Sequence, residues 1–234
     1  MHRSTSALLA AFFVSVTVCL VGPVQAEIIT EPTDLSVGEQ YRLVFVTSGS
    51  RDATSTDIED YNSFVDGHGD FAIASDWKVI GSTSSVDARD NTSSNPNADG
   101  AGVPLYNLAG ERVANDYADL WDGDLINAIG TNEYGDYSTE SGTAPYRVWT
   151  GSRHSGVGWE DNELGGVDDS TKFGYFHMAD GYWNAYSGTD QTKEFRLYGM
   201  SEMFTVGSSQ VVPEPAALLL ALVGLALLPR RRRR

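Results

Sequence analysis

Cysteine is almost absent from this chain: there is one, Cys19, inside an apolar stretch near the N-terminus. The range from Glu27 to Val212 therefore has no thiol, which excludes disulfides, thiolate metal sites and a cysteine nucleophile from it. A domain in that range has to be held together by its core. The 5 Trp, 11 Tyr and 9 Phe of the chain supply apolar area for such a core.

Positive charge is also scarce. The chain has 16 Lys and Arg against 32 Asp and Glu, a formal charge of -16. Because Arg3 and the arginines at 230–234 lie at the two ends, the range 27–212 keeps 10 basic and 31 acidic residues, a formal charge of −21. Such a field repels nucleic acid and anionic membranes and favours solubility. We therefore expect no nucleic-acid partner.

A hydrophobic run of full transmembrane length is missing at the C-terminal end. The apolar run 216–228 has 13 residues and would span roughly 20 Å as a helix, whereas a transmembrane helix needs about 20 residues. The arginines that follow resist translocation and stay on the cytoplasmic side. We therefore expect a short hydrophobic helix that anchors the chain only transiently.

The N-terminus has the three parts of a secretory signal peptide. His2 and Arg3 give a positive start, residues 7–21 form the apolar core, and small residues end it at Ala26. We expect a signal helix at 1–26 that signal peptidase removes, leaving Glu27 as the first residue of an exported chain.

The C-terminus resembles the PEP-CTERM sorting signal of Gram-negative bacteria. Pro213, Glu214 and Pro215 are followed by the apolar run and then by a basic cluster, in the order of that signal. The resemblance implies cleavage by an exosortase, transient anchoring in the inner membrane through 216–228, and final release or attachment at the cell surface. An ordinary tail anchor is the alternative, but it predicts a longer span. The cluster consists of Arg230, Arg231, Arg232, Arg233 and Arg234.

These boundaries divide the chain into a signal peptide at 1–26, an exported domain at 27–210 and a sorting signal at 211–234. The central range is long enough for one domain with its own core. Its β-branched and aromatic runs, separated by polar and glycine-rich segments, predict short strands. We expect these at 41–47, 77–80, 105–108, 111–114, 147–150, 173–176 and 194–206.

Helices are expected to be few. A capping box at Thr56 and Glu59 predicts a helix to about Val65, ended by the glycines at 67 and 69. Asp116 can cap a short helix through Trp121. The polar segment 81–102 predicts a long loop with one helical turn at 86–89.

The motifs YADLWDG at 117–123 and VWTGS at 148–152, together with the strand FRLYGMSEMFTV at 195–206, resemble a C-type-lectin-like domain. The most similar subfamily is bacterial, exported and functionally uncharacterised. The resemblance implies an α+β fold with mainly antiparallel strands, one or two short helices and long irregular loops. It also implies that the first and last strands pair. The disulfides of many members are missing here, so packing has to replace them.

The same resemblance directs attention to a calcium site. Calcium-dependent lectins use a proline-containing acidic loop and a following Trp-Asn-Asp strand. Here the loop at 152–172 is acidic, but it lacks that proline motif, and Ala185 stands where a ligand Asp is needed. A calcium site and a solvated acidic loop both remain open. The metal-ligand candidates are Glu160, Asp161, Glu163, Asp168 and Asp169.

A second acidic segment, 95–100, mimics the first half of an EF-hand loop. Its twelfth position is Tyr106 instead of the bidentate Glu that such a loop requires. A turn rich in Pro and Gly explains the segment more simply.

Trp159 is the candidate for sugar binding, because it lies in a polar, glycine-rich stretch where an exposed indole can stack on a sugar ring. The alternative is that it packs against its own loop. The other four tryptophans are expected in the core: Trp77, Trp121, Trp149 and Trp183. The candidate ligand-binding residues are Trp159, Asn162, Glu163 and Asn184.

Motifs of common enzymes are missing: there is no Gly-x-Ser-x-Gly, His-Glu-x-x-His, phosphate loop or dinucleotide fingerprint. We therefore expect a non-enzymatic cell-surface or extracellular-matrix protein that binds exopolysaccharide or another surface ligand. Calcium is its only candidate cofactor. Two alternatives remain, a secreted polysaccharide hydrolase and a calcium-dependent lectin or adhesin.

Overall fold

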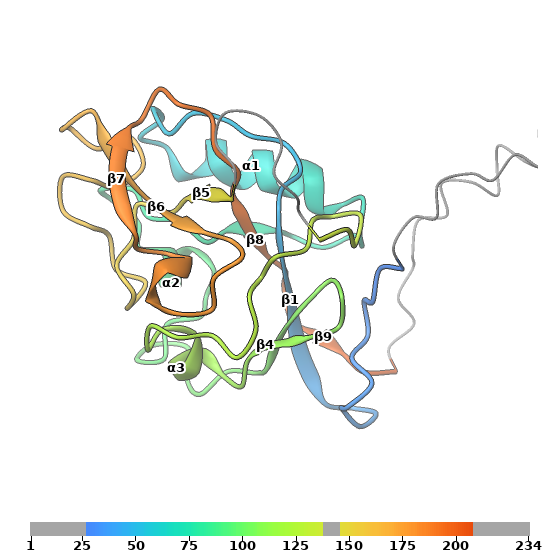
Figure 1. Ribbon diagram of the computed structural model, residues 1–234. Coiled ribbons are helices and arrows are strands. Elements are labelled where there is room, and N and C mark those ends of the chain that lie inside the picture. Colours follow the sequence, from blue (N-terminus) through green and yellow to red (C-terminus); the bar gives the residue numbers. More distant parts are fainter. Residues whose placement is uncertain (1–26, 138–145, 208–234) are drawn as a thin grey trace, which may run out of the picture.

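The computed structural model describes residues 27–137 and 146–207 and has an α+β fold, as the sequence predicts (Figure 1). Several predictions fall outside the described residues: the expected signal segment, the hydrophobic run 216–228, the expected processing residues Ala26, Pro213, Glu214 and Pro215, and the arginine cluster. The elements are β1 (Gln40–Val46), α1 (Ile58–Gly69), β2 (Lys78–Val79), α2 (Ala88–Asn91), β3 (Leu105–Asn107), β4 (Arg112–Ala114), α3 (Tyr117–Leu120), β5 (Arg147–Trp149), β6 (Ser170–Tyr175), the 3-10 helix η1 (Gly181–Trp183), β7 (Ser187–Asp190), β8 (Tyr198–Met200) and β9 (Phe204–Thr205).

The larger sheet is built around β1. Its strand order is β2-β8-β1-β3-β4, and β9 also pairs with β1. The pairs are antiparallel except β1 with β3. Tyr41 lies opposite Phe204, so the first strand pairs with the last one, as expected. The two ends of the described chain meet there: the Gly207 amide donates to a Glu31 carboxylate oxygen at 3.1 Å.

The second sheet contains β5, β6 and β7 in that order, all antiparallel. In Figure 1 it lies to one side of β1. Val148 of β5 forms an isolated bridge with Arg196, and the Trp149 amide donates to the Arg196 carbonyl at 3.0 Å. These contacts join the second sheet to the segment that leads into β8.

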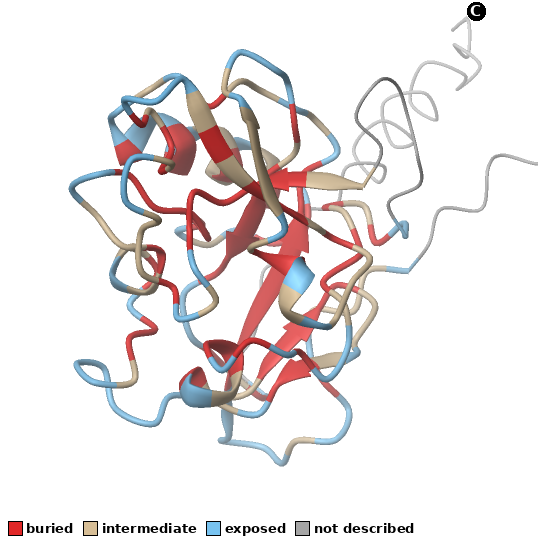
Figure 2. Cartoon of the chain, turned by 60° about the vertical axis from the view of Figure 1, so that its left-hand side comes forward, coloured by how far each residue is buried: buried red, intermediate tan, exposed pale blue. Residues whose placement is uncertain are grey.

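Two apolar clusters lie on opposite faces of β1. Tyr41, Leu43 and Phe45 belong to one cluster, whereas Val44 and Val46 belong to the other. This alternation follows from the two-residue period of a strand. Figure 2 shows the buried positions running through the central strands.

The four tryptophans expected in the core are buried, which confirms that prediction. The exposed fraction is 6% for Trp121 and 0% for Trp77, Trp149 and Trp183. Burying a large apolar side chain stabilises a fold by roughly 1.5–3 kcal/mol. With no disulfide in the range 27–212, these side chains are a main source of stability.

The expected boundaries of the first helix were wrong at both ends. Asp57, not Thr56, is the N-cap, and its carboxylate accepts from the Glu59 amide at 3.1 Å. The helix also runs past Val65 to Gly69. The reason is tertiary packing, because a side chain at Gly69 would clash with the Trp77 ring, and the glycine lets the ring approach the last turn.

Other local predictions need smaller corrections. The hairpin at 105–114 and the Asp116 cap of α3 are confirmed. The expected strand 194–206 is divided into β8 and β9, and the expected turn at 86–89 lies slightly later, in α2. Three α-helices are described instead of one or two, and η1 and β7 were not predicted. In the ranges 27–137 and 146–207 no helix has the length and apolarity to span a bilayer.

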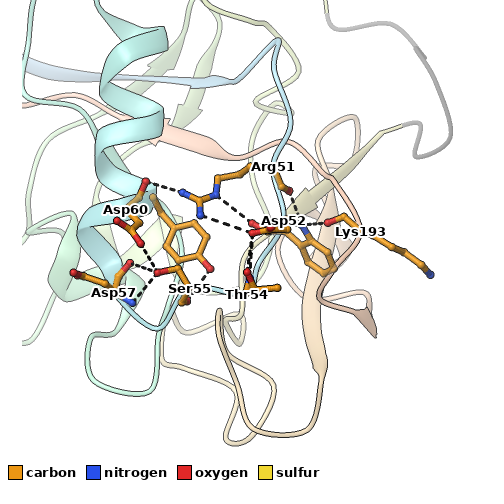
Figure 3. A network of polar contacts seen from close by, with 9 residues as sticks. Arg51, Asp52, Thr54, Ser55, Asp57, Asp60 and Lys193 are labelled. Atoms are coloured by element: carbon orange, nitrogen blue, oxygen red, sulfur yellow. Dashed lines mark hydrogen bonds and ion pairs between the residues drawn. The ribbon is translucent and has the colours of Figure 1, made fainter.

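Arg51 connects the segment after β1 to α1 (Figure 3). Its guanidinium lies 4.3 Å from the Tyr61 ring centroid and donates to the Asp60 carbonyl at 2.7 Å. The Tyr61 hydroxyl in turn donates to the Ser55 carbonyl at 2.8 Å. Stacking on an aromatic ring is typical of Arg because of its planar guanidinium.

Candidate functional site

The loop at 152–172 is held by its own backbone. Ser152 forms a bridge with Gly158, and the Trp159 amide donates to the Gly151 carbonyl at 2.9 Å. Gly151 has a φ of 60°, and a Cβ there would lie 2.6 Å from backbone atoms of two other segments. The glycine therefore allows Leu164 of the loop and the Ser82 carbonyl to approach this position closely.

Trp159 is half-buried, and two basic side chains lie over its indole ring. The Lys172 Nζ lies 4.1 Å from the indole centroid, and the Arg153 Cζ lies 5.3 Å from it. Cation–π contacts of this kind stabilise by about 0.5–1 kcal/mol. The geometry fits the alternative that Trp159 packs against its own loop better than it fits an open stacking platform.

The other candidate ligand-binding residues are largely used by the fold. Asn184 is 0% exposed, its Nδ2 donates to the Arg153 carbonyl, and its Oδ1 lies 3.2 Å from His154 Nδ1. The Asn162 backbone N–H donates to the Trp159 carbonyl, and the Asn162 backbone carbonyl accepts from the Lys172 N–H. Trp159, Asn162 and Glu163 are thus brought together in one loop, while Asn184 is buried behind it.

Four of the five metal-ligand candidates are exposed, and only Glu163 is buried, at 9% exposure. Burial raises the pKa of the Glu163 carboxyl, and the charges of Asp161 and Glu160 add to that effect. Asp169 accepts from the Gln191 side chain at 3.2 Å. Across residues 27–137 and 146–207, no group of three or more His, Cys, Asp or Glu side chains is placed to hold a metal ion.

A chain of aromatic rings on the second sheet was not predicted. Its two most exposed members are Tyr182 and Tyr186, at 50% and 47%; the other three are partly exposed. Successive ring centroids are 5.2, 4.7, 5.7 and 4.4 Å apart. We call this chain of rings the aromatic strip; in spatial order it contains Tyr182, Tyr186, Tyr175, His177 and Tyr146.

The strip is positioned by the ends of regular elements. Tyr175 ends β6, and the Tyr186 amide donates to the Phe173 carbonyl at 2.9 Å just before β7. The Tyr182 amide is capped by the Asp180 carboxylate at 3.1 Å. Phe173 is 3% exposed and lies beneath, 5.8 Å from both Tyr175 and Tyr186.

The aromatic strip can bind a partner that presents both apolar faces and hydroxyl groups. Grouped exposed aromatic rings mark interaction surfaces, and each Tyr hydroxyl can donate and accept a hydrogen bond. The sequence carried a signal for it, because rings are dense at 173–177 and 182–186. That density does not reveal that the two segments lie side by side.

Comparison with known proteins adds no functional assignment. No family model matches the chain, and neither does any curated protein.

Proposed function

We propose that this is an exported, non-enzymatic cell-surface or extracellular-matrix protein of a Gram-negative bacterium that binds polysaccharide through the aromatic strip. The observation that carries the proposal is the continuous chain of rings from Tyr182 to Tyr146. Neighbouring rings are tilted by 53–87° to one another, so an extended polymer meets a row of ring faces and edges.

The charge of the domain selects among polysaccharides. A formal charge of −21 over 27–212 repels uronic-acid and sulfated polymers at long range. Neutral and amino-sugar polymers are not repelled. Asp180 and Asp190 flank η1 and β7, and both are exposed, so they can accept hydrogen bonds from sugar hydroxyls. The proposed ligand is therefore a neutral or cationic exopolysaccharide.

The rest of the chain supports the export part of the proposal. The signal peptide at 1–26 and the PEP-CTERM-like segment at 211–234 indicate handling by signal peptidase and exosortase. The C-type-lectin-like fold is supported by the pairing of β1 with β9 and by the long irregular connections around the second sheet. That fold hosts many unrelated binders, so the ligand has to be argued from the site.

Affinity electrophoresis tests the binding. The exported protein is run through gels that contain a neutral glucan, chitosan or alginate. We expect retardation by the neutral glucan or by chitosan and none by alginate at low ionic strength. Tyr182→Ala and Tyr186→Ala should each weaken retardation at least several-fold, because removing one stacked ring costs about 1–3 kcal/mol at comparable stacking sites.

Phe71→Ala is the matched control, since Phe71 is an aromatic residue that is 63% exposed outside the strip, in contact with Tyr134. It should not change retardation. A wild-type protein retarded by none of the polymers rules out the proposal. Equal loss in Phe71→Ala and Tyr186→Ala would show that binding does not involve the strip specifically.

A further inference from the structure

A cavity lies between the start of β1, the loop after α2 and α3, away from the aromatic strip in the sequence. Its volume is about 410 Å³, within the range of small-molecule sites. Its lining combines one basic, one acidic and several polar and apolar side chains. The lining side chains include Arg42, Ser93, Asp99, Val103, Tyr117 and Met203.

Arg42 is a buried cation that has acidic neighbours, Asp99 and Glu202, but no carboxylate in direct contact among the described residues. Its side chain is 7% exposed, and Nη1 donates to the Thr92 carbonyl and lies 3.2 Å from the Met200 sulfur. Within the described ranges it forms no ion pair, and its Nε has no hydrogen-bond partner. Burial lowers the pKa of Arg42, but a guanidinium stays charged in proteins. Asp99, Glu202 and Tyr117 compensate the charge in part, and a carboxylate in direct contact would compensate it more fully.

The walls of the cavity hold the guanidinium in place. Its Cζ lies 5.4 Å from the centroid of Tyr117, which is 2% exposed. Gly102 has a φ of 82°, and a Cβ there would lie 2.3 Å from the Tyr117 ring, so the loop closes on Tyr117 only with glycine. The geometry around Arg42 is therefore pre-formed, as small-ligand sites usually are.

Asp99 restricts which anion can enter. It is exposed, lines the cavity, and acts electrostatically on Arg42. Its Oδ2 accepts from the Asn95 amide at 2.8 Å, which fixes the carboxylate at the end of the turn at 95–99. A ligand that carries only negative charge is repelled by this carboxylate and by the acidic field of the whole domain. A ligand that also carries an ammonium group has no net charge and can pair that group with Asp99.

We propose that the cavity binds a small zwitterion of the amino-acid class. The ligand carboxylate pairs with Arg42, whose planar guanidinium matches carboxylate geometry. The ammonium group faces Asp99, and an apolar ligand side chain lies against Val103 and Met203. This site does not depend on polysaccharide binding by the aromatic strip.

Thermal unfolding and calorimetry of the exported protein test the site, with free apolar amino acids as probes. We expect at least one of them, at about 10 mM, to raise Tm by mass action, with a stoichiometric heat of binding. The N-acetylated form of that amino acid, which lacks the ammonium charge, should bind at least tenfold more weakly. Arg42→Met should lose binding at least tenfold.

Asp99→Asn is the second variant, because it changes an exposed side chain and leaves the buried Arg42 intact. It should bind the amino acid and its N-acetyl form with equal affinity. If no amino acid shifts Tm in the wild type, the proposal is overturned and Arg42 has a structural role only. Unchanged binding in Arg42→Met, or an unaltered preference in Asp99→Asn, also overturns it.

Discussion

The indole N–H of Trp149 donates to the carbonyl oxygen of Arg51 at 3.1 Å, across 98 positions of sequence. The same N–H lies 3.2 Å from the Lys193 carbonyl, and the indole stacks on Phe195 with centroids 4.2 Å apart. Trp149 thus joins the second sheet, the segment after β1 and the segment before β8. In a domain without disulfides, these non-covalent contacts hold the three segments together.

We expect Trp149→Ala to destabilise the protein by about 3–5 kcal/mol, because it removes a fully buried aromatic side chain. Trp149→Phe keeps a ring against Phe195 but loses the hydrogen bonds, at a cost of roughly 1–2 kcal/mol. Urea unfolding followed by circular dichroism measures both values. Equal costs for the two variants would contradict a role for the indole N–H.

The contact between Trp159 and Lys172 predicts a coupling energy. In a double-mutant cycle with Trp159→Ala and Lys172→Met, we expect about 0.5–1 kcal/mol. The control cycle pairs Trp159→Ala with Lys193→Met, an exposed lysine that donates to Thr189 instead. Its coupling should be near zero. Similar coupling in both cycles would mean that Trp159 does not depend on its neighbouring cation.

Glu163 predicts a pH dependence of stability. Its folded-state pKa is raised, so the fold prefers the protonated carboxyl. The stability it contributes is fully present below the unfolded pKa and is lost as pH rises through the raised folded value. Glu163→Gln should therefore be more stable than wild type at pH 7, with the difference vanishing below the unfolded pKa.

Thermal melts of Glu163→Gln from pH 4 to 8 measure this effect. Glu194→Gln is the control, because Glu194 is exposed and lies outside the acidic loop. A Glu163→Gln variant that is less stable than wild type at neutral pH would show that the carboxylate is needed in its charged form.

The signal-peptide and sorting-signal hypotheses predict two cleavages. Mass spectrometry of the exported protein should find Glu27 as the N-terminal residue and no peptide that contains Arg230 to Arg234. Replacing Pro213, Glu214 and Pro215 by alanine should retain the chain in the inner membrane with its C-terminus intact. Surface material that still carries Arg234 would contradict the sorting-signal hypothesis.

Much of the local structure could be predicted from the sequence. The strand around Leu43, the hairpin at 105–114 and the Asp116 cap depend on residues close together in the chain, so periodicity and capping chemistry reveal them. The burial of Trp149 was expected from its place in VWTGS, a motif of the family that the chain resembles. The composition alone showed that no disulfide cross-links the domain and that its net charge is negative.

The tertiary structure decided which side chains from distant parts of the chain lie next to each other. Trp77 packs on Gly69, and α1 continues past Gly67 to end at Gly69, four residues later than the sequence predicted. The aromatic strip and the Arg42 cavity join segments far apart in the chain, such as Arg42 and Met203. Whether a ring or a cation is buried, paired or open depends on which distant segments pack around it. Long-range packing sets those neighbours, and no pattern within a short window of the sequence contains them.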